Sequence, residues 1–316
     1  MKKLIYVLSA IATAFAGTAS ADVSVSGTGA TNFTSSGDKN YTSTSGSVAF
    51  ALSTTTASGM AISAAAGITT DLEGTAARGT SGLTSLTFVT GGATIVIGQD
   101  IAAPQIGGVG GVASDLVDQN HQTINAAPAI GTDGDQDGNG VKFTTAVGGG
   151  SLTAAYVWDG SPDSTGGRGD FDAANQSMGI SFSMPAGAAT ITVGHSTSSD
   201  ATTENDTMTG ATLAYPVGGG TLSVGYKQTT GEVKADAMSA AYKMSLDADT
   251  AVSIGYNTAS EGAQSAQTTE AKITRAIGGG ASVFAELKNS TGNSSGVTKS
   301  GTQSSSTFAI GTSVAF

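Results

Sequence analysis

Charged side chains are scarce in this chain, and they form two groups that could act on ions. Only 12% of the 316 residues are Asp, Glu, Lys or Arg, roughly half the share of an ordinary soluble domain. Residues 101–140 hold five acids and no base, whereas several lysines lie in segments where polar and apolar residues alternate. The acids are Asp115, Asp118, Asp133, Asp135 and Asp137, and the lysines are Lys142, Lys227, Lys243, Lys272 and Lys288. Opposite charges that face each other across narrow water would sort ions by sign and orient dipolar solutes.

Three of the acids also match the beginning of a calcium-binding loop. Asp133, Asp135 and Asp137 alternate along the chain and are followed by Gly138, as in the D-x-D-x-D-G pattern. Alternate carboxylates can converge on a hard cation, and the glycine permits a sharp turn. The acid expected at the twelfth position is absent, because Thr144 stands there. Two alternatives therefore remain for this segment: a Ca²⁺ site, or an acidic turn in contact with solvent.

Two short motifs resemble enzyme sites but lack the context that their chemistry requires. Residues 108–113 fit a dinucleotide-binding glycine pattern, but they do not lie between a predicted strand and a crossover helix. Residues 194–198 nearly match a nucleophile elbow around Ser196, but the final glycine is missing. With no Cys and only His121 and His195, thiolate and metal-assisted catalysis are disfavoured. A hydrolase that uses Ser196 and His195 remains a lesser alternative, because spacing cannot show whether a triad converges.

The first 21 residues are expected to form a signal peptide. Lys2 and Lys3 precede an apolar run over 4–16, and residues 19–21 supply the small side chains of a cleavage site. Cleavage would leave residues 22–316 and change the formal charge from −11 to −13, because two of the thirteen bases are lost. This acidity disfavours nucleic acid as a partner. Export of a chain without cysteine is compatible with an oxidising compartment.

Period-two alternation of apolar with small or polar residues recurs along the chain and predicts β-strands. The segments 177–184 and 250–258 show it clearly. The predicted strands are 22–33, 45–55, 60–71, 83–90, 94–100, 140–147, 151–159, 175–184, 189–197, 208–217, 220–229, 236–245, 250–258, 268–277, 281–289 and 304–316. Glycine-rich turns such as 217–222 join some strands, and longer polar segments, among them 34–44 and 259–268, separate others. Sixteen strands of roughly 9–11 residues with alternating short and long connections predict an all-β, antiparallel transmembrane barrel.

The two faces of the predicted strands favour a barrel over a packed sandwich. One face carries the large apolar side chains, whereas the other is mostly Gly, Ala, Ser and Thr with an occasional Lys, which suits contact with water. Aromatic residues on the apolar face near the strand ends predict two girdles at the membrane interfaces. The girdle residues are Tyr156, Trp158, Tyr226 and Tyr256 toward the long connections, and Phe88, Phe182 and Tyr242 toward the short turns. The alternative is that these rings form ordinary sheet core.

The C-terminal strand carries a resemblance to a known family. Phe308, Ile310, Val314 and the terminal Phe316 alternate in a pattern that resembles the C-terminal signature of Gram-negative outer-membrane barrels. Together with the signal peptide, the sixteen strands and the long third connection, the whole mature chain resembles a Gram-negative general porin. It is most similar to the glycine-rich, acidic alphaproteobacterial type.

The resemblance implies a set of partners and sites. It implies a homotrimer in the outer membrane that contacts lipid and lipopolysaccharide and is recognised by the barrel assembly machinery. It also implies that residues 101–140 form a third loop folded into the lumen as a constriction, with Asp115 and Asp118 facing the wall lysines. No cofactor is required.

The expected function is passive diffusion of ions and small hydrophilic solutes through a water-filled channel, with a mild cation preference from the acidic loop. The main alternative is a secreted or surface-layer adhesin, because Gly, Ser and Thr with low charge also occur in extracellular β proteins. Such a protein would have one uniform repeat and no terminal aromatic residue. An outer-membrane barrel hydrolase is the lesser alternative.

Overall fold

The strands of the protein form one antiparallel sheet that is closed on itself. The computed structural model describes residues 21–36, 39–71, 79–81, 85–101, 138–158, 176–199, 206–230, 234–261, 264–293 and 302–315. The strands are β1 (Ala21–Ser36), β2 (Lys39–Thr55), β3 (Ala61–Asp71), β4 (Gly79–Ser81), β5 (Ser85–Thr90), β6 (Ala93–Ile101), β7 (Gly138–Val147), β8 (Gly150–Trp158), β9 (Gln176–Ala186), β10 (Ala189–Ser199), β11 (Asp206–Val217), β12 (Gly220–Thr230), β13 (Ala235–Ser245), β14 (Thr250–Glu261), β15 (Gln264–Gly278), β16 (Ala281–Asn293) and β17 (Thr302–Ala315).

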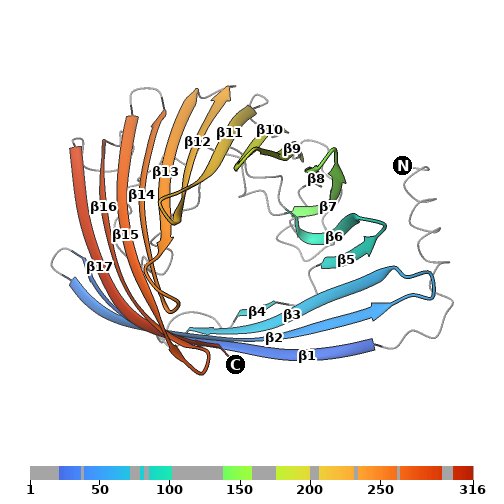
Figure 1. Ribbon diagram of the computed structural model, residues 1–316, viewed down its shortest axis with the longest axis horizontal. Helices are drawn as coiled ribbons and strands as arrows, with labels where there is room; N and C mark the ends of the chain where they lie inside the picture. Colours follow the sequence, from blue (N-terminus) through green and yellow to red (C-terminus); the bar gives the residue numbers. More distant parts are fainter. Residues whose placement is uncertain are drawn as a thin grey trace, which may run out of the picture.

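Strand pairing closes the sheet into a barrel of sixteen positions. Each strand pairs with its neighbours in the chain, and β1 pairs with both β2 and β17, which joins the two ends of the sheet. Both β4 and β5 pair with β3, so these two short strands share one position. The predicted sixteen-stranded antiparallel barrel is therefore confirmed, and Figure 1 shows its strands following one another in a ring.

Several strands are longer than the alternation pattern predicted. The segments 34–44 and 259–268 were expected to be long polar connections, but this expectation is wrong. β1 and β2 stay paired as far as Ser36 and Lys39, and β14 and β15 as far as Glu261 and Gln264. Backbone hydrogen bonds extend the ladder whatever the side chains are, so polar residues beyond the apolar zone can continue a strand.

Tight glycine turns connect the strands at one end of the barrel. Between β11 and β12, Gly218 and Gly219 have φ angles of 58° and 80°. Two consecutive residues with positive φ form the type I′ turn, whose twist matches that of the flanking strands. The glycine-rich turn expected at 217–222 is confirmed.

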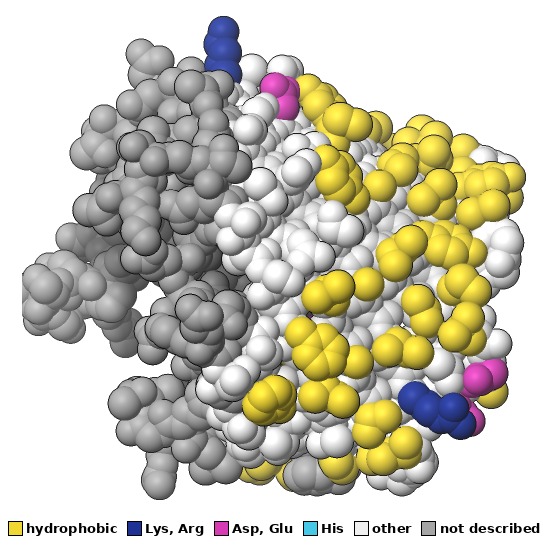
Figure 2. All heavy atoms as spheres, turned by 90° about the vertical axis from the view of Figure 1, so that its left-hand side faces the viewer, with side chains coloured by type: hydrophobic (Ala, Val, Ile, Leu, Met, Phe, Trp, Pro, Cys, Tyr) yellow, Lys and Arg dark blue, Asp and Glu magenta, His cyan; other side chains and the backbone are white. Residues whose placement is uncertain are grey.

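Large apolar side chains lie on the outer face of the barrel rather than in a core. The exposed ones include Val25, Ile180, Leu213, Ile254 and Ile310, each on the outward phase of its strand. Figure 2 shows hydrophobic side chains spread over the outer face on the β13–β17 side, with acidic and basic side chains only near its edges. No helix in the described part of the chain is long and apolar enough to cross a membrane.

Tyrosines near the long connections form a regular outer belt. The hydroxyls of Tyr156, Tyr226 and Tyr256 each donate a hydrogen bond to a polar side chain of the next strand, and Trp158 lies beside Tyr156 with ring centroids 5.7 Å apart. At the other end, the Tyr242 hydroxyl donates to the carbonyl of Val217 at 3.0 Å, in the turn between β11 and β12. Rings with polar tips at both ends suit the two membrane interfaces.

Candidate functional site on the inner wall

The five lysines singled out in the sequence all lie on the inner phase of their strands. Each is next to an outward-facing side chain, as Lys272 is to the exposed Ile273 and Lys288 is to the exposed Leu287. Because successive side chains point to opposite faces, the lysines face the interior of the barrel. They come from β7, β12, β13, β15 and β16, so they are distributed around much of the inner wall.

Two acids complete a charged cluster that the sequence analysis missed. Glu270 and Lys272 are on the same face of β15, and Glu286 and Lys288 are on the same face of β16. In the register of this hairpin, Lys272 lies opposite Glu286 and Glu270 lies opposite Lys288. Opposite charges therefore alternate both along each strand and across the two strands. The signal was present in the sequence, because the turn at 278–280 sets this register once the hairpin is recognised.

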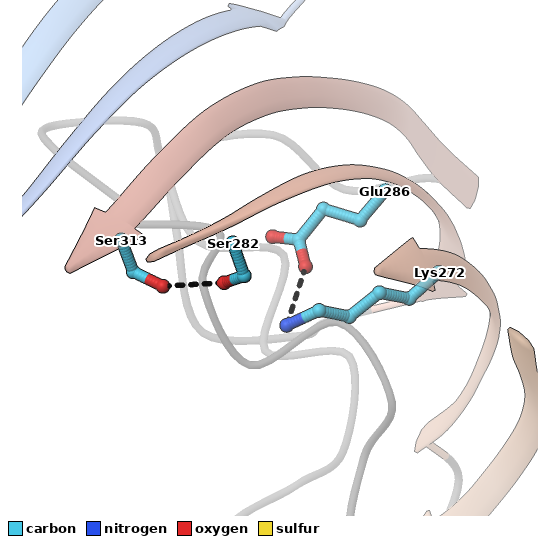
Figure 3. A network of polar contacts seen from close by, with 4 residues as sticks. All are labelled: Lys272, Ser282, Glu286 and Ser313. Carbon is cyan, nitrogen blue, oxygen red and sulfur yellow. Dashed lines mark hydrogen bonds and ion pairs between the residues drawn. The ribbon is translucent and has the colours of Figure 1, made fainter. Parts of the chain in front are cut away.

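The Lys272–Glu286 pair is the best-defined part of this cluster. The Lys272 Nζ lies 3.6 Å from the Glu286 Oε2 and 5.1 Å from the centre of the Phe284 ring. The Glu286 side chain is completely buried, and that of Lys272 is 15% exposed. Figure 3 shows the pair beside Ser282 and Ser313, whose Oγ atoms are 2.8 Å apart. A carboxylate, an aromatic face and a neighbouring strand thus hold one ammonium in place.

Phe284 faces inward because the neighbouring strand leaves room for it. On β17 its register partner is Gly311, and a Cβ atom there would come within 2.6 Å of the Phe284 Cζ. The glycine is therefore required for the ring to lie flat along the wall. The face of the ring contacts the Lys272 ammonium, which limits the directions in which the ammonium can point.

A second part of the inner wall is unusually buried. Val157 of β8 and Met208 of β11 are each only 1% exposed, although both are on the inward phase. Ser196 of β10 shares this phase and is also buried. Lys142 belongs to the same wall, since its register partner on β8 is Ala155, which is 4% exposed.

The structure places Ser196 and His195, the two residues of the hydrolase alternative, on opposite faces of the barrel wall. His195 is on the outward phase of β10, where its Nδ1 lies 3.1 Å from the Thr209 Oγ1, whereas Ser196 is inward and buried. Adjacent strand residues point to opposite faces, so Ser196 and His195 do not act as nucleophile and base.

Other predicted site residues divide between the described and undescribed parts of the chain. Phe308, Ile310 and Val314 lie on the outward face of β17 and are exposed. Among the described residues, no group of three or more acids, histidines or cysteines could hold a metal ion. Several predictions lie outside the described residues: the first twenty residues of the signal peptide predicted over 1–21, the glycine motif over 108–113, and Asp115, Asp118, His121, Asp133, Asp135, Asp137 and Phe316.

Comparisons with known proteins agree with this geometry. The sequence profile of a family described as Gram-negative porin matches residues 8–295. The solved structure of OmpT, an outer membrane protein of Vibrio cholerae in trimer form, is similar with a TM-score of 0.67 and 14% identity, over 94% of this chain and 100% of that chain. An anion-selective porin from Comamonas acidovorans gives a TM-score of 0.66 and 14% identity over 94% and 100% of the two chains. Another solved porin gives 0.68 and 16% identity over 93% and 100%.

At these identities the structural likeness concerns the fold. A search among curated proteins found no match.

Proposed function

Because this chain belongs to the Gram-negative porin family and is an outer-membrane channel, we propose that it lets ions and small hydrophilic solutes diffuse passively, with a mild preference for cations. The observation that carries the proposal is that the closed barrel has an apolar outer face and a polar inner face. Large apolar residues face outward, while Gly, Ser, Thr and Lys line the inside. Such an interior suits water, and transport through it requires no energy coupling. The adhesin alternative is set aside by the family and the closed barrel.

The cation preference depends on acids that lie between β6 and β7. The inner wall described above is rich in lysine, and a solved porin of similar fold is anion-selective, so neither the wall nor the fold supplies this preference. The formal charge of −13 expected for residues 22–316 and the five acids of residues 101–140 support it instead. We place Asp115 and Asp118 at the narrowest part of the lumen, where fixed charges act most strongly on passing ions.

The burial of one wall supports an inward course for this connection. Val157 and Met208 face the interior, yet both are almost fully covered, and a sheet face open to water would leave them accessible. Residues 102–137 leave β6 and enter β7, directly beside β8. Both ends of the proposed constriction loop therefore lie close to the buried part of the wall.

Reversal potentials in a salt gradient across a planar bilayer test the selectivity. The wild-type channel should favour K⁺ over Cl⁻, and the double variant D115N/D118N should lose that preference. The matched control is D247N/D249N, which removes two acids from the turn after β13 and should leave the reversal potential unchanged. An anion-selective wild type would overturn the proposal, as would a D115N/D118N channel with wild-type selectivity.

We further propose that the channel is a homotrimer whose subunits meet on the outer wall of β1–β3. The Vibrio cholerae relative is described in trimer form. On this wall the outward positions include Gly27, Gly29 and Gly46, and the Thr31 and Thr44 hydroxyls lie 3.5 Å apart. Between the exposed Val25 and Phe33, these small and hydroxyl side chains make a flat patch that packs against protein better than against lipid.

The porin family and fold point to a non-enzymatic channel, and we propose that no covalent chemistry or bound cofactor supports conduction. For Asp133, Asp135 and Asp137 we propose an acidic turn exposed to solvent. Conductance should then be equal in EDTA and in millimolar Ca²⁺. A conductance or selectivity that depends on Ca²⁺ and is lost in D133N/D135N would instead support the calcium site.

A further inference from the structure

A polar hollow of about 510 Å³ lies on the inner wall near the short turns of β12–β15. Six inward side chains with hydrogen-bond donors line it: Thr221, Lys243, Ser245, Ser253, Lys272 and Thr274. Among the described residues, the lining includes two lysines and no acid. The short turns of outer-membrane barrels face the periplasm, so the hollow lies at the periplasmic mouth.

The sheet register brings these groups together. Thr221, Lys243, Ser253 and Lys272 lie in one row across four adjacent strands. Neighbouring strands are about 4.8 Å apart, so the two lysine Cα atoms are separated by roughly 10 Å with the serine hydroxyl between them. Thr274 follows Lys272 on the same face of β15. The flexible stem of Lys243 can bring its ammonium toward that of Lys272, with a small anion between the two.

The two lysines differ in how firmly they are held. Lys272 is fixed between Glu286 and the Phe284 ring, and an ammonium that makes one ion pair still has further N–H groups to donate. Lys243 is exposed, two residues before the end of β13. Glu286 balances one of the two positive charges, but it is completely buried and does not line the hollow. Within the lining the excess of charge is therefore positive and centred on Lys243, while Asp247 and Asp249 lie in the neighbouring turn, outside the lining.

We propose that this hollow is a binding site for small oxyanions, with the phosphate group as the preferred ligand. The oxygens of a phosphate group would accept hydrogen bonds from both ammonium groups and from the hydroxyls of Ser253 and Thr221 or Thr274. A carboxylate has fewer oxygens for the same donors and would bind less tightly. The proposal rests on the barrel being a water-filled channel, but it does not rest on the cation preference, because it concerns a local site at one mouth.

Phosphate binding would show as a saturable reduction of conductance. The full-length channel is inserted into planar bilayers, and inorganic phosphate replaces chloride on either side in turn at constant ionic strength. We expect K243Q to raise the half-saturating phosphate concentration about tenfold, since it removes one charged donor. K243R should stay close to wild type, because the charge is kept.

The control variant K234Q removes the same charge at the opposite end of the same strand, where Lys234 precedes β13 and is exposed. It should leave the half-saturating concentration unchanged. Heat-modifiable migration on gels confirms that each variant is folded before it is compared. The proposal is overturned if phosphate does not reduce the wild-type conductance beyond acetate, or if K243Q and K234Q behave alike. Reversal potentials are read separately, so a failure of the cation preference can be told apart from a failure of this site.

Discussion

Single residues of the inner wall contribute stability as well as charge. Glu286 is buried beside Lys272, and its replacement by Ala would remove the carboxylate that lies 3.6 Å from the Lys272 Nζ. Breaking a fully buried pair costs several kcal/mol, but Lys272 faces the lumen, where water can reach it, so we expect a loss of about 1–3 kcal/mol. Urea unfolding in detergent micelles measures this loss.

Replacing both members of the pair separates the effect of the unpaired charge from other effects of the substitution. In K272M/E286L both charges are replaced by apolar side chains of similar size, so most of the stability lost in E286A should return. If E286A is as stable as wild type, the pair does not stabilise the β15–β16 hairpin.

Asp247 gives the turn between β13 and β14 a dependence on pH. Its carboxylate accepts hydrogen bonds from the backbone N–H groups of Asp249 at 2.9 Å and Thr250 at 2.8 Å. These bonds, first of all the one from Asp249, lower the pKa of Asp247 below its ordinary value of 3.8. The folded state therefore favours the ionised form. The contribution is complete above the ordinary pKa and is lost as the pH falls through the lower folded value.

Acid unfolding curves of the wild type and of D247N test this prediction. At neutral pH the wild type should be the more stable of the two, because Asn accepts weaker hydrogen bonds than a carboxylate. The difference between them should shrink once the pH falls below 3.8. A difference that is independent of pH would show that the carboxylate charge plays no part in the turn.

At the scale of elements, the alternation in the sequence was sufficient to predict all sixteen barrel strands and their inner and outer faces. The reason is physical, since outward positions must be apolar in lipid and inward positions must suit water. Strand ends outside the membrane carry no such requirement, so the extensions of β1, β2, β14 and β15 left no pattern to detect. The Lys272–Glu286 contact was missed because it depends on hairpin register, which the glycines at 278–280 determine.

The proposed trimer contact on the outer wall of β1–β3 predicts which substitutions prevent assembly. Gly29 faces outward in the middle of β1, and a Cβ atom placed there meets nothing within 4 Å, so the monomer has room for a larger side chain. In a trimer that packs through this wall, G29L would separate the subunits. We expect the variant to migrate as a folded monomer on gels without heating, whereas the wild type migrates as a trimer.

The matched control for assembly is A211L, since Ala211 is exposed and outward on β11, away from β1–β3. It should remain trimeric. If G29L is also a stable trimer, the subunits meet on another wall, and if the wild type is monomeric in mild detergent, the homotrimer itself is wrong.

At the scale of the whole molecule, the charges are divided between two parts of the chain. Among the side chains that the structure describes, the barrel wall supplies five inward lysines, partly balanced by Glu270 and Glu286, while residues 101–140 supply five acids and no base. If the connection between β6 and β7 lies in the lumen, the ion preference of the channel is the outcome of two opposing contributions. Each should become visible when the other is removed.

Replacing residues 105–134 by a short Gly-Ser linker should therefore do more than widen the channel. Larger neutral polymers should enter the lumen, because the narrowest part is gone. The selectivity should reverse from cations to anions, because the wall lysines then act on passing ions with few acids to oppose them. Reversal potentials and polymer exclusion are measured on the same folded variant. A wider channel that still prefers cations would mean that acids elsewhere set the preference, and an unchanged polymer cutoff would mean that this connection does not narrow the lumen.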